Sequence, residues 1–135
     1  MLKATVIRKK GKRSLEDVTK TLTRKMPSAV MAVAKFLNDE SDKLVPTDTT
    51  ALLESGKHYL LRDGIDAVAV VGYGSPDDQS YYSSKDGKIH RPHEYAVFVH
   101  NVPAYHNHGQ HDFLRTPYNS LRREMAAIFR LEMSR

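Results

Sequence analysis

The stretch KHYLLRDGIDAVAVVGY, residues 57–73, decides the fold class of this chain. Two runs rich in aliphatic, aromatic and β-branched residues, 57–62 and 65–73, flank the pair Asp63 and Gly64. An Asp-Gly pair between such runs is typical of a type I′ turn, whose twist suits an antiparallel hairpin. The second run is apolar on both faces over several residues. We therefore expect one face to pack on helices and the other to contact another subunit.

Helical patterns precede this hairpin. Ser14 and Asp17 resemble a capping box, and apolar residues follow at helical spacing: Leu15, Val18, Leu22 and Met26. Pro27 removes a backbone donor, so we expect a kink or a fresh helix start there. The next helical stretch ends before Pro46, and its apolar side consists of Val30, Val33, Phe36, Leu37 and Leu44. We interpret both stripes as core.

Shorter elements complete the pattern around these helices. Residues 3–9 predict a short strand. Residues 45–55, VPTDTTALLES, predict a turn and one short helical turn, with Thr47 or Asp48 as the N-cap. Residues 75–92 predict a loop or an extended hairpin, and residues 101–112 predict a second loop. We expect both segments to be mobile until a partner orders them.

The carboxyl-terminal part predicts one more strand or helical turn, at residues 95–100, and a closing helix. Pro117 suits the first turn of that helix. Its expected buried stripe is Leu121, Met125, Ile128 and Leu131, and Arg122, Arg123 and Arg130 fall away from it. The expected fold is α+β: a small antiparallel sheet of three to four strands, packed by N-terminal helices and one C-terminal helix. We expect a single domain over residues 1–135.

Composition excludes several classes of protein. Apolar residues make up 40% of the chain and charged residues 27%, which is ordinary for a folded domain. The chain has no cysteine, which excludes disulfides, thiolate zinc sites and cysteine nucleophiles and fits a reducing cytoplasm. The longest apolar run, 67–71, is too short to span a bilayer. No apolar stretch lies near the amino terminus, so we expect no signal peptide.

The net charge of +5 is unevenly distributed. Residues 8–13, RKKGKR, carry five positive charges and no negative one, and further arginines lie near the carboxyl end. Such a segment binds nucleic acid by neutralising phosphates, so a small basic DNA-binding protein is one hypothesis. The alternative is a solvated loop whose charge serves solubility.

Histidines cluster between residues 90 and 111. Four of the seven, His100, His106, His108 and His111, fall within twelve residues, and His90 and His93 lie just upstream. A histidine-dependent metalloenzyme is therefore another hypothesis. The spacing is not that of a helical ligand pair, however, and a loop containing Gly and Asn orients ligands poorly. Hydrogen bonding or stacking at an interface is the competing interpretation.

Other catalytic and cofactor patterns are weak. The GYGS segment, residues 72–75, lacks the second glycine that a nucleophilic serine motif requires. It also lacks the Gly-Lys-Ser/Thr continuation of a phosphate-binding loop. Turn chemistry explains it. We therefore expect no enzymatic activity and no cofactor.

Three segments carry a resemblance to a known family. Val45, Pro46, Asp48, Thr49, Leu52 and Ser55 form the first pattern, Tyr95, Ala96, Val99 and His100 the second, and Phe113, Leu114 and Pro117 open the third. In this order they resemble the head–tail joining proteins of tailed bacteriophages, which are also called neck, tail-completion or minor capsid-like proteins. The resemblance spans roughly residues 28–132. One position departs, because the family has glycine where this chain has Thr50; if that position requires positive φ, threonine is strained there.

The resemblance implies a structural virion protein assembled in the host cytoplasm, with no membrane association. Such proteins form a homo-oligomeric ring, of six or twelve copies, that joins the connector or adaptor to the tail tube or tail terminator around the DNA channel. Partner contacts would then come from the two polar loops and their flanks: Tyr81, Tyr82, His90, His93, His100, Tyr105, His106, His108 and His111. Channel-facing residues, making non-specific contact with genomic DNA, would be Lys9, Lys10, Lys12 and Arg13.

Overall fold

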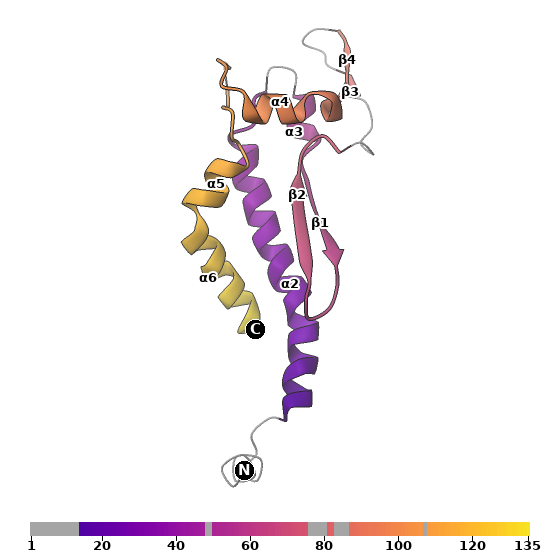
Figure 1. The fold of residues 1–135 in the computed structure, drawn as a ribbon, viewed down its shortest axis with the longest axis vertical. Helices are drawn as coiled ribbons and strands as arrows, with labels where there is room; N and C mark the ends of the chain where they lie inside the picture. The colour runs from indigo at the N-terminus through magenta and orange to yellow at the C-terminus, as the bar shows by residue number, and fades with distance from the viewer. Residues whose placement is uncertain (1–13, 48–49, 76–80, 83–86, 107) are drawn as a thin grey trace.

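One long helix, α2 (Leu15–Asp42), packs against the hairpin and the carboxyl-terminal helices in a computed structural model (Figure 1). The structure describes residues 14–47, 50–75, 81–82, 87–106 and 108–135. The strand expected at residues 3–9 and the basic residues Lys9, Lys10, Lys12 and Arg13 lie outside the described residues. The predicted α+β class is confirmed, since helices pack against small antiparallel strand pairs.

The start of α2 follows its sequence signal. The Ser14 hydroxyl accepts a hydrogen bond from the Asp17 N–H at 3.2 Å, and Glu16 and Asp17 place negative charge at the positive end of the helix dipole. The fresh start expected at Pro27 is wrong, because the helix continues through that residue. Tertiary contacts hold it on both sides: the Lys25 Nζ donates to the Met133 carbonyl at 2.9 Å, and Ala29 is fully buried.

The hairpin consists of β1 (Lys57–Arg62) and β2 (Val68–Gly72), paired antiparallel from Lys57 opposite Gly72 to Arg62 opposite Val68. The predicted two-residue turn is wrong. A type I′ turn needs positive φ at both central residues, and only Gly64, at φ 90°, has it. Residues 63–67 form a longer turn, closed by the Ala67 N–H donating to the Gly64 carbonyl at 3.2 Å. Ile65 and Asp66 therefore lie in the turn and not in β2.

The four described strands form two separate pairs instead of one continuous sheet. The second pair, β3 (Tyr81–Tyr82) and β4 (Ile89–His90), lies within the segment expected to be a loop or extended hairpin. A short turn of helix, η1 (Pro92–Glu94), leads to α4 (Ala96–Asn101), so the helical alternative for residues 95–100 is confirmed.

The closing segment differs from the single helix expected. It is divided into α5 (Arg115–Ser120) and α6 (Arg122–Met133), because Leu121 leaves helical geometry at φ −111° and ψ 27°. Pro117 is buried within α5, and Met125 is buried in the predicted stripe. Leu131 is wrongly placed in that stripe, since 58% of it is exposed. The outward positions predicted for Arg122, Arg123 and Arg130 are confirmed.

The core lies where the carboxyl end of α2 meets α3 (Ala51–Glu54), α4 and the start of α5. Val45, Leu52, Ala96 and Phe113 form its buried centre. The N-cap of α3 is Thr50, not Thr47, and Asp48 lies outside the described residues. The second glycine of the GYGS segment, Gly74, lies at φ 68°, and a Cβ there would lie 2.7 Å from the Pro92 carbonyl oxygen. Close packing, not chemistry, requires that glycine.

Candidate partner interface

An open apolar groove of about 930 Å³ lies beside α2. Figure 1 shows α6 and the hairpin on opposite sides of that helix. Both pack on α2, so the helix forms the floor of the groove and β2 and α6 form its walls. The floor consists of Val30, Val33, Ala34 and Leu37. One end is closed by α4, α5 and the residues just before α5, including Val97, Phe113 and Tyr118.

The groove corrects the interpretation of the second helical stripe as core for three of its five residues, whereas Leu44 does pack against the core. Val30, Val33 and Leu37 are only partly buried, and they face an open surface. Among the described residues, eight hydrophobic residues other than proline are buried, whereas thirteen large hydrophobic residues are exposed. Isolated exposed apolar residues are normal, but a contiguous apolar surface of this kind marks a site of association. The sequence could not reveal this, because helical periodicity identifies an apolar face but does not show which elements cover it in the folded chain.

One end of the groove carries a small polar cluster around Asp112. The Arg115 Nη1 contacts the Asp112 Oδ1 at 2.6 Å, and His111 Nε2 lies 3.5 Å from the other carboxylate oxygen. His100 Nδ1 lies 3.9 Å from Oδ1, and the Asp112 N–H donates to the His100 carbonyl at 2.7 Å. The His100 ring also meets the Phe113 ring edge-on at 4.9 Å. Two predicted interface residues, His100 and His111, are thus brought to one carboxylate.

The remaining predicted interface residues do not converge on the groove. Tyr81 and Tyr82 lie in β3, where Tyr81 pairs with His90 in β4. The His90 ring lies 6.5 Å from the Tyr95 ring. Four more residues of the predicted set lie in η1 and in the loop after α4, some exposed and some half-buried: His93, Tyr105, His106 and His108. Residues 109–112 of that loop are anchored to the core, in part by the Gln110 N–H, which donates to the Leu44 carbonyl at 2.8 Å.

The metal-site hypothesis gains no support from these positions. Within the described part of the chain, no group of three or more His, Asp or Glu side chains is placed to hold a metal ion. His100 and His111 share a single carboxylate, and Arg115 already occupies one of its oxygens. The arrangement suits an ion-paired surface cluster better than a coordination site.

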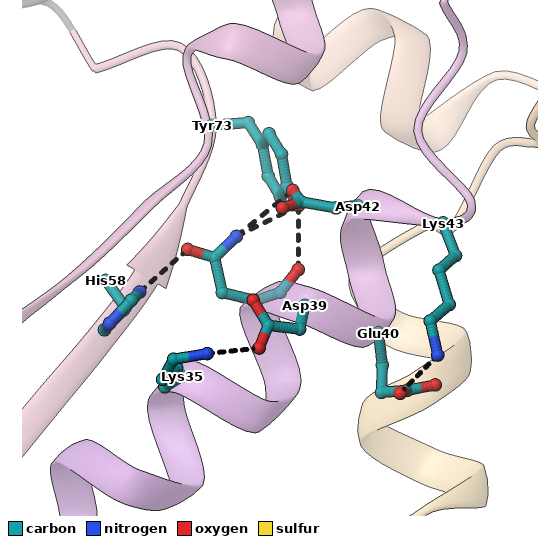
Figure 2. Close-up of polar contacts among 8 residues, drawn as sticks. Lys35, Asp39, Glu40, Asp42, Lys43, His58 and Tyr73 are labelled. Atoms are coloured by element: carbon teal, nitrogen blue, oxygen red, sulfur yellow. Dashed lines mark hydrogen bonds and ion pairs between the residues drawn. The ribbon is translucent and has the colours of Figure 1, made fainter.

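A second polar cluster, missed at the sequence level, joins α2 to the hairpin. Figure 2 shows Tyr73 and Asp42 directed toward each other, and the Tyr73 hydroxyl donates to the Asp42 carboxylate at 2.5 Å. The Asn38 side-chain amide donates to the same carboxylate at 3.2 Å and accepts from the His58 Nδ1 at 3.0 Å. Asn38 is buried on the packed side of α2, where Ala29 and Ala34 are also buried, and that polar residue was the available signal.

The chemistry of this cluster is structural. Burial, together with the hydrogen bond to the negatively charged Asp42, raises the pKa of Tyr73 far above its ordinary value. The phenol therefore stays protonated and acts as a donor throughout the neutral range. A tyrosine held in this way fixes the position of β2 on α2, so it defines one wall of the groove.

Comparison with known proteins gives no assignment: no family model, curated protein or solved structure matches the chain. Among the helices of the described residues, none has both the length and the apolar composition needed to cross a bilayer. The open apolar groove, walled by β2 and α6 on the floor of α2, is the feature of this molecule from which a function must be inferred.

Proposed function

We propose that this chain is a structural subunit of the head–tail neck of a tailed bacteriophage, which assembles into a homo-oligomeric ring through its apolar groove. The groove is the observation that carries the proposal. A site of about 930 Å³ lined almost wholly by aliphatic and aromatic side chains favours a hydrophobic protein surface as its occupant. Its polar residues, Arg115 among them, lie at one end, as in the polar rim of a protein interface.

The position of Thr50 supports the family resemblance. The phage proteins that the sequence resembles have glycine there, and glycine favours a left-handed backbone. In this chain Thr50 adopts that conformation, with φ 64° and ψ −17°, immediately before the short helix α3. The chain thus keeps the backbone geometry that the family's glycine would serve, although it carries a different residue.

The outward arginines supply the second feature of a neck subunit. Arg122, Arg123 and Arg130 are exposed on α6, away from the buried Met125. The Arg122 guanidinium stacks over the Tyr118 ring at 5.4 Å, which presents it at the surface. In a ring around a DNA channel, such residues would neutralise phosphates without reading sequence. The same residues serve the alternative of a small DNA-binding protein.

The mass of the assembled protein tests the proposal. Sedimentation of the purified full chain, alone and with connector and tail-tube proteins, is expected to give a species of six or twelve times the 15.3 kDa chain mass. A closed ring keeps that mass as concentration rises, whereas non-specific association does not. A chain that remains monomeric in all of these mixtures would contradict the proposal.

A further inference from the structure

The first two turns of α2 lie outside the body of the molecule. Residues 15–22, here called the arm, extend past the tip of the hairpin and the carboxyl end of α6 (Figure 1). Residues 15–20 are all exposed, and Leu15 keeps 81% of its surface in solvent. Residues 21 and 22 are half-buried, and burial becomes complete further along, where the Lys25 side chain contacts the end of α6 and Ala29 is fully buried.

The arm is amphipathic. Leu15, Val18 and Leu22 recur at spacings of three and four residues, so they share one face of the helix. The opposite face of the same helix carries Lys20 in the arm and Arg24 just after it. An exposed helical end with an apolar stripe gains little from that stripe unless another surface covers it. Among the residues that the structure describes, none covers Leu15 and Val18, so this part of the stripe is available for a contact.

The arm cannot fill the groove of its own chain. Leu15 and Val33 are eighteen residues apart, about five helical turns, so both lie on the same face of one continuous helix. Val18 and Val33 are separated along that axis by about 22 Å at the rise of an α-helix. Because the arm and the groove floor belong to one rigid rod, the arm cannot fold back onto the floor. Only another molecule can bring an equivalent stripe to it.

We infer that the arm of one copy docks into the groove of a second copy. The sizes match, because two turns of an α-helix about 10 Å wide occupy about 850 Å³, close to the groove volume of about 930 Å³. The chemistry also matches, since an aliphatic stripe meets a floor of Val30, Val33 and Leu37 and a wall that includes Ala126 and Phe129. The inference rests on the proposed function and names the two surfaces that would build its ring.

This contact joins different surfaces on the two copies. Such a heterologous interface leaves one arm and one groove unused in every open oligomer, so copies continue to add until the chain of contacts closes. A ring results when the rotation from each copy to the next adds up to a full turn after a whole number of copies. The arm therefore serves as the connecting element between adjacent subunits, and the body remains folded on its own core.

Paired substitutions in the full chain separate this contact from general effects. Leu15→Asp with Val18→Asp removes the stripe and lowers the net charge by two. Lys20→Gln with Arg24→Gln lowers the charge equally on the opposite face and is the matched control. Ala126→Glu blocks the groove from an exposed position on α6. Since all five positions are exposed, circular dichroism is expected to show unchanged folding in every variant.

Sedimentation velocity gives the readout. The arm variant and the groove variant are each expected to be monomeric, with the dissociation constant between copies raised about 100-fold or more. The arm variant loses two aliphatic contacts, and the groove variant places a charged side chain in the apolar groove. The control is expected to assemble as the unmodified chain does. Mixing the arm variant with the groove variant leaves one intact arm and one intact groove, so a one-to-one pair is expected.

The outcomes are distinguishable. Normal assembly of the Leu15→Asp, Val18→Asp chain would overturn the arm-in-groove contact while leaving ring formation intact. Failure of the two monomeric variants to pair when mixed would also overturn it. If the unmodified chain itself stays monomeric with and without its neck partners, the proposed function fails first. Pairing of the two variants in the mixture supports the contact, because two misfolded variants would not form a one-to-one pair.

Discussion

The two ends of α2 show opposite relations to the rest of the chain. At its carboxyl end, Asn38 and Ser41 are buried, and Val45 just beyond it lies in the core with Leu52, Ala96 and Phe113. At its amino end, residues 15–20 are exposed although Leu15 and Val18 are apolar. One helix thus contributes to the buried core at its carboxyl end and exposes an apolar stripe at its amino end, and the groove lies between the two.

This difference indicates which part of the helix serves folding and which serves assembly. Burial of aliphatic and aromatic groups stabilises the monomer only where the chain covers them itself. The exposed apolar residues of the arm and the partly buried residues of the groove floor stabilise an isolated chain less than the core residues do, although they follow the same helical period. The comparison predicts large stability effects at the packed end and small ones at the arm.

Phe113→Ala is expected to give the largest effect. Phe113 is 1% exposed and packs edge-on against both Tyr73, at 5.2 Å, and His100. Loss of this ring leaves a cavity and should lower the free energy of unfolding by about 3–5 kcal/mol. Urea denaturation followed by circular dichroism at a fixed, low protein concentration measures the change.

Leu15→Ala is the matched truncation at the arm. The side chain is exposed, so the free energy of unfolding of the dilute monomer should change by no more than about 0.5 kcal/mol. Equal decreases in the free energy of unfolding for Phe113→Ala and Leu15→Ala would refute the division between a packed end and an assembly end of α2. The same Leu15 variant should still weaken association at higher concentration.

Tyr73→Phe is expected to have an intermediate and pH-dependent effect. At neutral pH it removes the hydrogen bond to Asp42 and should cost about 1–2 kcal/mol of the free energy of unfolding. The folded state holds the pKa of Tyr73 above that of the unfolded chain. Above about pH 10 the unfolded tyrosine loses its proton while the folded one keeps it, so the unmodified protein loses stability as pH rises.

Tyr73→Phe has no phenol to ionise, so it does not lose stability in this way above about pH 10. The difference in stability between the two proteins should therefore shrink from about pH 9 to about pH 11, by at most about 1.4 kcal/mol per pH unit. Tyr59→Phe, on the exposed outer face of β1, is the control for removing a hydroxyl at neutral pH and should cost less than about 0.5 kcal/mol. A gap between the unmodified protein and Tyr73→Phe that widens above pH 10 would contradict the assignment of Tyr73 as a buried donor.

Local signals in the sequence identified most of the elements. The cap at Ser14, the apolar period of α2, the two strands of the hairpin and the buried Met125 of α6 were all predicted, because each depends on neighbours a few residues away. The wrong predictions concern features that depend on tertiary contacts. Packing carries α2 through Pro27, and the chain turns at Leu121 between α5 and α6.

The candidate site was less accessible from sequence. Its floor residues Val30, Val33 and Leu37 have the spacing of a core helix, and nothing in the spacing shows that β2 and α6 leave them open. The predicted histidine cluster contributes His100 to the groove and His111 to its polar end, but the basic segment at residues 8–13 lies outside the described residues. A site formed between elements distant in sequence requires their arrangement in space.

Thr50→Gly should change the free energy of unfolding by a small amount, and with the opposite sign. A residue with a Cβ in the left-handed region costs about 1–2 kcal/mol, whereas glycine loses about 0.5–1 kcal/mol in chain entropy. Because Thr50 holds φ 64° beside the buried Ala51 and Leu52, the glycine variant should gain about 0.5–1 kcal/mol of unfolding free energy. Thr50→Val removes the hydroxyl but keeps the branched Cβ, so urea denaturation should show no gain for it. A loss of stability in Thr50→Gly would remove the backbone argument for the resemblance, because glycine would then relieve no strain at the position where the phage proteins carry it.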